Sequence, residues 1–369
     1  MVPGPAEPAS LRIAARLRTI IEQTLEVAPQ IHLMFVTNIH DGELSDGGPA
    51  GLSSVAQSYT RREADEIIRG FQALGVTVES FFSEIDFISA VTQHSSPRES
   101  KHRVVFTDAE GGTGSGRRAL IPALCRLVSL PVLNSGAHAC SLTRHKFHAN
   151  AVLRRVGVRV PETWLFTGGA WLADLQPPGG SRVIIKPTYE SMGIGVGEDS
   201  VRIVDAGFHQ FIRDRAARFG QPTVVQEFIT GQEVGVPLAR LEKTYALKPV
   251  VMRQANGDPY GARPKTFLDE NVNHNLSHVP FEATDAQHAA LRDATTLAFD
   301  ALEMSGVARI DLRIDSDGRA YIIDVNADPP PVAGTCWSFA MQKLGFSVQE
   351  MPAAWLGICL QEHGLISGV

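Results

Sequence analysis

The segment VARIDLRIDSDGRAYIIDVN reads as a β-hairpin whose charged residues recur at every second position. Successive side chains of a strand point to opposite faces, so this alternation gathers charged residues on one face and aliphatic residues on the other. The residues expected to share faces are Arg309, Asp311 and Arg313 of the first strand and Ile322, Asp324 and Asn326 of the second. A turn centred on Ser316–Asp317 would place Arg309 opposite Asp324, with Asp311 diagonal to it.

Three of these residues could ligate a divalent metal ion. Asp311, Asp324 and Asn326 offer hard oxygen donors, which suit Mg2+ or, in its place, Mn2+. Mg2+ that is bound to a polyphosphate needs only a few protein ligands, because phosphate oxygens and water complete its octahedral coordination. The three oxygen donors beside an arginine fit this requirement. A solvated strand face with ordinary ion pairs is the alternative. An EF-hand is excluded, since the acids around Gly318 lack its spacing and its bidentate glutamate.

A lysine beside a glycine-rich loop indicates a phosphate site. Lys186 lies in the apolar strand VIIKP, just before the loop SMGIGVG, and a buried ammonium group requires an anion. Backbone N–H groups of such a loop can contact phosphates. The alternative is a lysine at a strand edge that extends to water and is followed by an ordinary turn.

A second glycine-rich loop, GGTGSGRR at 111–118, follows the strand RVVFTD. It has the spacing of a P-loop, but Arg117 and Arg118 stand at the lysine and hydroxyl positions, so we do not expect a P-loop NTPase. A loop at the carboxyl end of a parallel strand is instead expected to line a substrate site. Glu110, Arg117 and Arg118 are candidates for the first-substrate pocket, and a solvated loop with a cationic helix start is the alternative.

The surrounding sequence predicts the elements that position these residues. Strands at 31–36, 76–82 and 103–107 alternate with helices at 61–74 and 117–129, which indicates a parallel α/β unit over about 30–135. A helix with an apolar stripe of Leu11, Ala14, Leu17 and Ile21 precedes this unit. Further helices are expected over about 139–156 and 285–304, the second of them just before the hairpin.

Composition excludes several classes of protein. The 369 residues are 44% hydrophobic and 20% charged, which is typical of a soluble globular chain of two or three domains. A formal charge of -6 argues against general nucleic-acid binding. The four cysteines include no C-x-x-C pair, so a reduced cytoplasm is the simplest location. No apolar run could cross a membrane, and the N-terminus lacks the apolar core of a secretory signal.

The motifs occur in one order: a lysine on a helix, a lysine on a strand before a glycine loop, E-F-I-x-G-x-E, and the R-x-D hairpin ending in D-x-N. This order resembles the ATP-grasp superfamily, most closely its D-alanine–D-alanine ligase branch. The likeness runs from about Asn134 to Leu360 and includes NSGAHACSLTRHKFHANAVLRRVGVRVPETW, VIIKPTYESMGIGV, VVQEFITGQEVGV and GVARIDLRIDSDGRAYIIDVNADPPP. It implies an ATP-grasp fold of α/β and α+β structure, with an N-terminal α/β domain (1–135), a small central lid domain (136–228) and a C-terminal catalytic domain (229–369).

The resemblance also implies a role for each matching residue. The residues that would contact ATP are Lys146 and Lys186 at the α- and β-phosphates, Glu190, Ser191 and Gly193 in the loop over the phosphates, the backbone of Phe228 and Ile229 at the adenine edge, Gln226 at its amino group, and Glu233 at the ribose. Lys265 would lie near the γ-phosphate. Asp311, Asp324 and Asn326 would ligate the metal, and Arg309 would stabilise charge on the reacting carboxylate.

Several positions depart from the pattern of the ligases. Asp324 replaces a glutamate, and Met192 replaces a serine that touches the first amino acid. Pro330 replaces a glycine, so it has no N–H to offer to an oxyanion. The substrate motif H-G-x-x-G-E-x-G is absent, and DAEGGTGSG stands in its place. The substrate is therefore not expected to be D-alanine, although Thr335 matches the position that binds the carboxylate of the second substrate.

The implied activity is that of an ATP-dependent, ADP-forming ligase. Such an enzyme activates a carboxylate as an acyl phosphate and joins it to an amine, here an amino acid, in an amide or peptide bond. Its partners would be small molecules rather than nucleic acid or membrane, and relatives of this fold are often homodimers. Two alternatives stay open: a cyclase or acyl kinase of specialised metabolism that consumes no external amine, and a nucleotide-binding protein without turnover.

Overall fold

The computed structural model describes residues 9–40, 59–93, 102–111, 114–191, 193–254 and 276–367. The helices in these ranges are α1 (Ala9–Val27), α2 (Arg61–Gln72), α3 (Glu84–Gln93), α4 (Leu120–Leu127), α5 (Ala137–Arg144), α6 (Lys146–Arg155), α7 (Phe208–Phe219), α8 (Asp285–Ala301), α9 (Cys336–Lys343) and α10 (Met351–Glu362). The strands are β1 (Ile31–Val36), β2 (Ile39–His40), β3 (Tyr59–Thr60), β4 (Thr77–Phe81), β5 (His102–Thr107), β6 (Thr163–Thr167), β7 (Ala170–Trp171), β8 (Arg182–Pro187), β9 (Val201–Ile203), β10 (Thr223–Glu227), β11 (Gln232–Arg240), β12 (Thr244–Ala246), β13 (Val250–Gln254), β14 (Leu276–Pro280), β15 (Val307–Ile314) and β16 (Ala320–Asn326).

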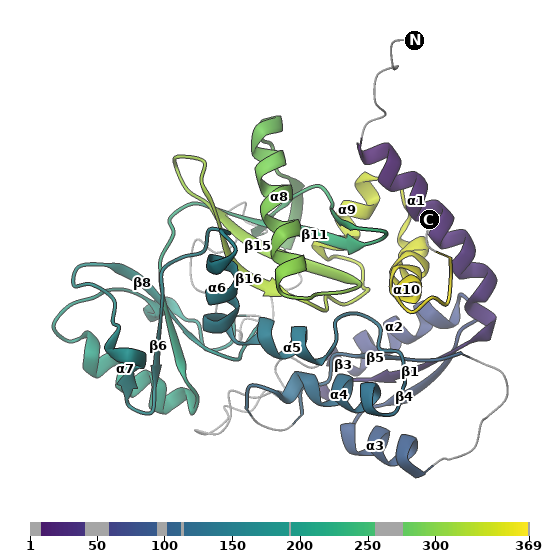
Figure 1. The fold of residues 1–369 in the computed structure, drawn as a ribbon, viewed down its shortest axis with the longest axis horizontal. Helices are drawn as coiled ribbons and strands as arrows, with labels where there is room; N and C mark the ends of the chain where they lie inside the picture. The colour runs from purple at the N-terminus through teal and green to yellow at the C-terminus, as the bar shows by residue number, and fades with distance from the viewer. Residues whose placement is uncertain are drawn as a thin grey trace.

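The first sheet is parallel, with the strand order β4-β1-β5, and helices cover both of its faces (Figure 1). Leu33 and Phe35 of β1 are buried in a core that they share with α1, α2 and α10. Met34 and Val36 point to the opposite face, where they pack with α3 and α4. This is the α/β unit predicted over 30–135, and β1 has the predicted bounds.

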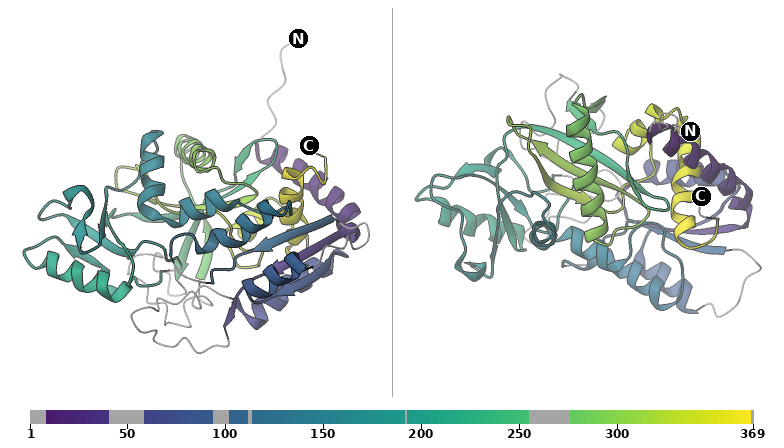
Figure 2. Two further views of the ribbon diagram at one scale, coloured as in Figure 1. Left: turned by 60° about the horizontal axis from the view of Figure 1, so that its bottom comes forward. Right: turned by 45° about the horizontal axis from the view of Figure 1, so that its top comes forward.

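Helix α1 packs against α10, so the two ends of the described chain cover the first sheet together (Figure 2). A Cβ at Gly357 of α10 would lie 2.1 Å from Oγ1 of Thr24 in α1, and only glycine permits this close approach. The predicted apolar stripe of α1 is correct for Leu17 and Ile21, which are buried. It is wrong for Leu11, which is 54% exposed because the buried stripe begins after it.

The second sheet is antiparallel in the order β7-β6-β10-β8-β9, and α7 packs on one face. Val183 and Ile185 of β8 and Val225 of β10 form the core beneath α7. Lys186 and Gln226 are each offset by one residue from this set, so they lie on the opposite face of the same two strands. The alternation of side chains thus places Lys186 and Gln226 on the face of this sheet that points away from α7.

The third sheet has the order β14-β13-β11-β15-β16, with β12 paired to β11, and α6 and α8 pack on one face. Its last two strands form the predicted hairpin, but the predicted register is wrong. Asp311 lies opposite Asp324, and Arg309 lies opposite Asn326. The register shifts within the hairpin, so Ile322 is buried in the core, 1% exposed, instead of sharing the face of Asp324.

The single helix predicted over 139–156 is two helices, α5 and α6, that meet at His145. His145 has φ of -88° and ψ of 86°, which lies outside the α region. Its Nδ1 accepts a 3.4 Å hydrogen bond from the backbone N–H of His148 and so caps the new helix. The break makes Lys146 the first residue of α6. Hydrophobic periodicity cannot reveal such a break, because it continues across the junction.

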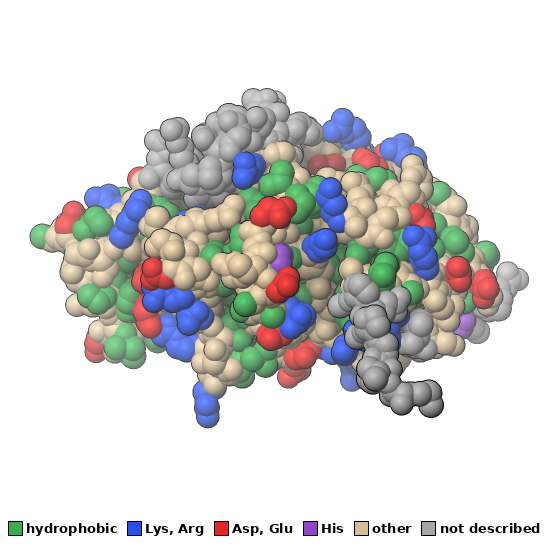
Figure 3. All heavy atoms as spheres, turned by 90° about the horizontal axis from the view of Figure 1, so that it is seen from above, with side chains coloured by type: hydrophobic (Ala, Val, Ile, Leu, Met, Phe, Trp, Pro, Cys, Tyr) green, Lys and Arg blue, Asp and Glu red, His purple; other side chains and the backbone are tan. Residues whose placement is uncertain are grey.

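The surface and the cysteines are consistent with the composition. In the part of the chain that the structure describes, no helix is long and apolar enough to span a membrane. Basic and acidic side chains are interspersed among the coloured residues of the face shown in Figure 3. All four cysteines are buried and carry free thiols, as expected without a disulfide scaffold.

Candidate active site

Two lysines from different elements approach Asp324 on the hairpin. The Nζ of Lys146 lies 3.7 Å from Oδ1 of Asp324 and donates a hydrogen bond to the carbonyl oxygen of Glu190. Burial lowers the pKa of Lys186 to about 8, although the negative charge of Asp324 opposes this shift. Burial also lowers the pKa of Lys146. Both ammonium groups are therefore poorly solvated, and an anionic ligand would stabilise them.

Arg309 and Asp311 form a bidentate ion pair on the charged face of β15. The Nε and Nη2 atoms of Arg309 donate hydrogen bonds to the two carboxylate oxygens of Asp311, each over 2.9 Å. Paired hydrogen bonds of this kind fix the plane of the guanidinium group as well as its position. Arg309 is thereby oriented on the strand face that also carries Asp324.

The oxygen donors of this face fit a hard divalent cation. Asp311 and Asp324 are cross-strand partners, and Oδ1 of Asn326 accepts a 3.2 Å hydrogen bond from the backbone N–H of Asp328. Burial opposes ionisation of Asp324, but the surrounding positive charges, those of Lys146 and Lys186 foremost, together outweigh it and hold its pKa below the usual value. Among the described residues, no three His, Cys, Asp or Glu side chains form a metal-binding group by themselves. Two carboxylates and an amide suit Mg2+ that also takes phosphate and water oxygens.

A buried amide oxygen lies on the face of the second sheet that points away from α7. Gln226 is 1% exposed, and its Nε2 donates a 3.4 Å hydrogen bond to Oγ1 of Thr163. Its Oε1 is buried and accepts no hydrogen bond in the structure. An unsatisfied buried acceptor costs about 1–3 kcal/mol, so this position favours a ligand that donates a hydrogen bond. The exocyclic amino group of adenine fits this requirement.

The segment after β10 is held by an arginine of the hairpin. The guanidinium groups of Arg182 and Arg313 lie over the ring of Phe228, at 4.6 and 4.8 Å from its centroid. Arg313 also donates hydrogen bonds to the carbonyl oxygen of Ile229 over 3.0 Å and to Glu233 over 3.4 Å. The proposed adenine and ribose contacts are thus tied to the hairpin by one side chain.

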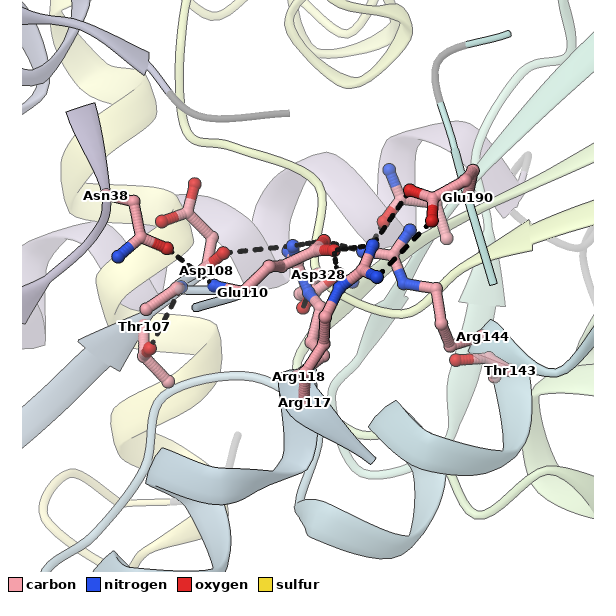
Figure 4. A network of polar contacts seen from close by, with 12 residues as sticks. Asn38, Thr107, Asp108, Glu110, Arg117, Arg118, Thr143, Arg144, Glu190 and Asp328 are labelled. Carbon is pink, nitrogen blue, oxygen red and sulfur yellow. Dashed lines mark hydrogen bonds and ion pairs between the residues drawn. The ribbon is translucent and has the colours of Figure 1, made fainter. Parts of the chain in front are cut away.

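A buried network of ion pairs joins four segments of the chain, and we call it the arginine–carboxylate cluster (Figure 4). Its members are Glu110, Arg117, Arg118, Arg144, Glu190 and Asp328. Arg117 pairs with Glu190 over 2.8 Å and with Glu110 over 3.2 Å, and Glu110 also pairs with Arg118 and Arg144. Arg118 reaches Asp328 over 2.5 Å. Glu110 and Arg117 are only 2% and 6% exposed, so the alternative of a solvated loop is wrong for both.

The loop that carries Glu110 is fixed at the carboxyl end of the first sheet. Glu84 accepts hydrogen bonds from the side chain of Asn38 over 2.9 Å and from the backbone N–H of Gly111 over 2.5 Å. The Oδ1 of Asn38 in turn accepts a 2.8 Å hydrogen bond from the backbone N–H of Glu110. A Cβ at Gly111 would lie 2.5 Å from a carboxylate oxygen of Glu84, so a larger residue here would displace this carboxylate.

Other predicted residues have local roles or lie outside the described ranges. Thr335 caps the N-terminus of α9, where its Oγ1 accepts a 3.1 Å hydrogen bond from the backbone N–H of Ser338. The carbonyl oxygen of Ser191 accepts a 3.0 Å hydrogen bond from Ile194, and Gly193 between them has φ of 77°, which favours glycine. Lys265 and Met192 lie outside the described residues.

Sequence reasoning missed three residues of this region. Arg144 and Asp328 each lie two residues from a predicted site residue, and Arg313 was assigned only to the charged face of the hairpin. Proximity to a motif was the signal that could have drawn attention to them. Their partners could not be read from spacing, because Asp328 pairs with an arginine 210 residues away.

Residues 167–352 match the protein family described as D-ala D-ala ligase C-terminus. The D-alanine–D-alanine ligase of Bordetella petrii is 26% identical over 237 residues, which make up 64% of this chain and 70% of that protein. The D-alanine–D-alanine ligase of Ectopseudomonas mendocina is 22% identical over 319 residues, or 85% of this chain and 94% of that protein.

Two solved structures share the fold. The D-alanine–D-alanine ligase from Bacillus anthracis complexed with ATP has a TM-score of 0.65 at 14% identity, over 90% of this chain and 99% of that chain. The VanG D-Ala:D-Ser ligase from Enterococcus faecalis has a TM-score of 0.60 at 15% identity, over 89% of this chain and 99% of that chain. The family match extends over half of the sequence, so this chain is an ATP-grasp protein that belongs to the D-Ala–D-Ala ligase C-terminus family.

Proposed function

We propose that this protein is an ADP-forming ligase that activates a carboxylate as an acyl phosphate and joins it to an amine, namely an amino acid. The observation that carries the proposal is the gathering of Lys146, Lys186 and Arg309 around the carboxylates of Asp311 and Asp324. Three cations beside two carboxylates leave positive charge, which a triphosphate with its metal ion would balance. The names of the sequence relatives support the same class of reaction.

In this proposal the nucleotide lies between the second and third sheets. Lys146 and Lys186 bind its phosphates, and Gln226 accepts a hydrogen bond from the adenine amino group. The segment Phe228–Ile229 contacts the adenine edge through its backbone, and Glu233 binds the ribose. The remaining proposed contacts come from the glycine loop and from the segment that contains Lys265, and they are Ser191, Gly193 and Lys265.

The chain supplies charge neutralisation and orientation rather than a covalent nucleophile. Mg2+ held by Asp311, Asp324 and Asn326 would neutralise charge on the transferred phosphoryl group. The substrate carboxylate attacks this group to give the acyl phosphate and ADP, and the amine then displaces phosphate through a tetrahedral oxyanion. Arg309 stabilises that charge, and its ion pair with Asp311 keeps it oriented. Because Pro330 has no N–H, more of this stabilisation falls to Arg309.

We further propose that the activated acid is larger and more polar than D-alanine. The region beside the first sheet holds three arginines and three carboxylates in the arginine–carboxylate cluster, where Glu110 and Arg117 are buried. The methyl group of D-alanine would gain little binding free energy beside these charged side chains, whereas a polar side group could form hydrogen bonds with them. Thr335 remains the candidate contact for the carboxylate of the amine substrate.

The ligase proposal is tested by trapping the activated acid with hydroxylamine. The purified protein is incubated with Mg-ATP, hydroxylamine and a panel of amino acids and other carboxylic acids, and ADP and hydroxamates are followed by mass spectrometry. We expect ADP together with the hydroxamate of one polar acid, and neither product from the variant K186M. A hydroxamate of D-alanine would contradict the substrate proposal. ADP with an internally condensed product would indicate a cyclase, and no ADP with any acid would favour a nucleotide-binding protein.

Nucleotide affinity should also depend on pH through Lys186. The pKa of this lysine is lowered to about 8 in the absence of a ligand, and the phosphates bind its charged form. Affinity should therefore be nearly constant below about pH 7 and fall about tenfold between pH 7 and pH 9, as the charged fraction falls. Calorimetric titration with Mg-AMP-PNP measures this, and K186R should give a flat profile because arginine stays charged. An equally flat profile in the unmodified protein would contradict the assignment of Lys186.

A further inference from the structure

Glu190 connects the arginine–carboxylate cluster with a lysine of the proposed nucleotide site. Its carboxylate is fully buried and accepts hydrogen bonds from Nη1 and Nη2 of Arg117, over 3.3 and 2.8 Å. Its backbone carbonyl oxygen accepts a hydrogen bond from Nζ of Lys146, which also faces Asp324. One residue at the start of the glycine loop is therefore held from both sides, by its side chain and by its backbone.

Gln221 and Arg117 both donate hydrogen bonds to the carboxylate of Glu190, and they come from different parts of the chain. Gln221, which follows α7, donates a 2.7 Å hydrogen bond to Glu190 and accepts one of 2.8 Å from the backbone N–H of Tyr189. These contacts lie within the unit formed by the second sheet. Arg117 instead follows the first sheet, and its guanidinium group lies between Glu190 and Glu110 (Figure 4). Arg117 is thus a direct link from the loop of the first sheet to the glycine loop.

We infer that Arg117 is a positioning residue, which couples the loop beside the first sheet to nucleotide binding through Glu190 and Lys146. This inference rests on the proposed function for the identity of the ligand that Lys146 binds. Without Arg117, the buried carboxylate of Glu190 loses the cation that donates hydrogen bonds to both of its oxygens and faces Glu110 across the vacated space. The charge of the Glu190 carboxylate then attracts the ammonium group of Lys146 and competes with the phosphates of the nucleotide for it. A substrate that shifts Arg117 would therefore change the affinity for the nucleotide. By linkage, the nucleotide would change the affinity for that substrate by the same factor.

The inference is tested by a double-mutant cycle that needs no knowledge of the substrate acid. Binding of Mg-AMP-PNP is measured by calorimetry for the unmodified protein and for R117M, E190Q and the double variant R117M/E190Q. We expect R117M to weaken binding about tenfold and E190Q by about threefold or less, within the range of couplings between contacting residues. The double variant should bind like E190Q alone, because a neutral amide no longer competes for Lys146. The inference would be overturned if the loss of affinity in the double variant equalled the product of the two single losses. It would also be overturned if R117M bound Mg-AMP-PNP like the unmodified protein.

Further variants separate positioning from a loss of structure. R117K keeps the charge but cannot span both carboxylates, so it should show an intermediate loss that E190Q also relieves. The matched control is R154M, since Arg154 is 47% exposed and pairs with Glu162 on the outside of α6. This variant should bind the nucleotide analogue like the unmodified protein.

A second measurement distinguishes this inference from the proposed function. Hydrogen–deuterium exchange over residues 183–191 should be faster in R117M and R117K than in the unmodified protein, whether or not a nucleotide is present. If the unmodified protein binds no nucleotide but both variants still loosen this segment, the proposed function fails while the positioning role of Arg117 stands. Unchanged exchange in both variants would refute the positioning role itself.

Discussion

Replacement of Lys186 by methionine should remove activity and at the same time stabilise the fold. Methionine matches the length and apolar character of the lysine stem but carries no charge, so the phosphates lose one of the two lysines proposed to bind them. Loss of one preorganised electrostatic contact of this kind typically costs at least about 100-fold in rate. The pKa of Lys186 falls from 10.5 to about 8 on burial, which means that the folded state disfavours the charged form. Removing this charge should raise the free energy of unfolding by about 3 kcal/mol at pH 7, since one pKa unit corresponds to about 1.4 kcal/mol.

The two effects are measured separately, by ADP release and by urea denaturation. Lys248 is exposed and provides the matched control, because K248M removes the same charge from a solvated position and should change neither quantity. A gain in stability without a loss of activity would show that Lys186 is buried for another reason. A loss of stability would mean that the neighbouring carboxylates outweigh the cost of burying the ammonium group.

Replacement of Arg118 by methionine should destabilise the protein by about 3–5 kcal/mol, the usual cost of removing one partner from a buried ion pair. Arg118 contacts Asp328 and Glu110, and these three side chains are at most 11% exposed. Its Nη1 also donates a 3.0 Å hydrogen bond to the carbonyl oxygen of Asp108. Burial opposes the charge of Arg118, but Asp328 and Asp108 outweigh it and raise the pKa. Glu110 keeps two other arginines after the substitution, whereas Asp328 loses its hydrogen-bonded ion-pair partner and keeps only the more distant charge of Arg144.

Urea denaturation of R118M and of R118M/D328N tests this reasoning. The double variant should recover part of the stability, because it removes the carboxylate that the single variant leaves unpaired. The control R154M breaks an exposed ion pair and should cost about 1 kcal/mol or less. A loss below this value for R118M, or a double variant less stable than the single one, would show that the pair with Asp328 contributes little.

Local patterns predicted much of the architecture. The alternation in β15 correctly placed Arg309, Asp311 and Arg313 on one face, and the strands of the first sheet fell where the apolar runs predicted them. These features depend on side-chain periodicity, which is visible in a short window of sequence. The register of the hairpin was not predictable in this way, because one irregularity in pairing changes every partner beyond it.

The site itself was only partly visible for a different physical reason. Lys146, Lys186 and Asp324 were selected by their neighbours in the sequence and by resemblance to a family, and the fold does bring them together. The arginine–carboxylate cluster depends on contacts between distant segments, such as that of Arg117 with Glu190, which are 73 residues apart. A charged residue in a loop looks the same in the sequence whether its partner is water or a buried carboxylate.

The packing of α1 and α10 on the first sheet also has a consequence for synthesis of the chain. The strands of this sheet end at Thr107, but the helix that completes one side of its core begins only at Met351. Ribosomes add about 5–20 residues per second, so the nascent sheet waits for tens of seconds with part of its apolar face uncovered. During that interval Phe35 and Phe106 lack the ring of Trp355, which contacts Phe106 in the folded protein. The N-terminal unit is therefore expected to need chaperone protection until α10 has left the ribosome.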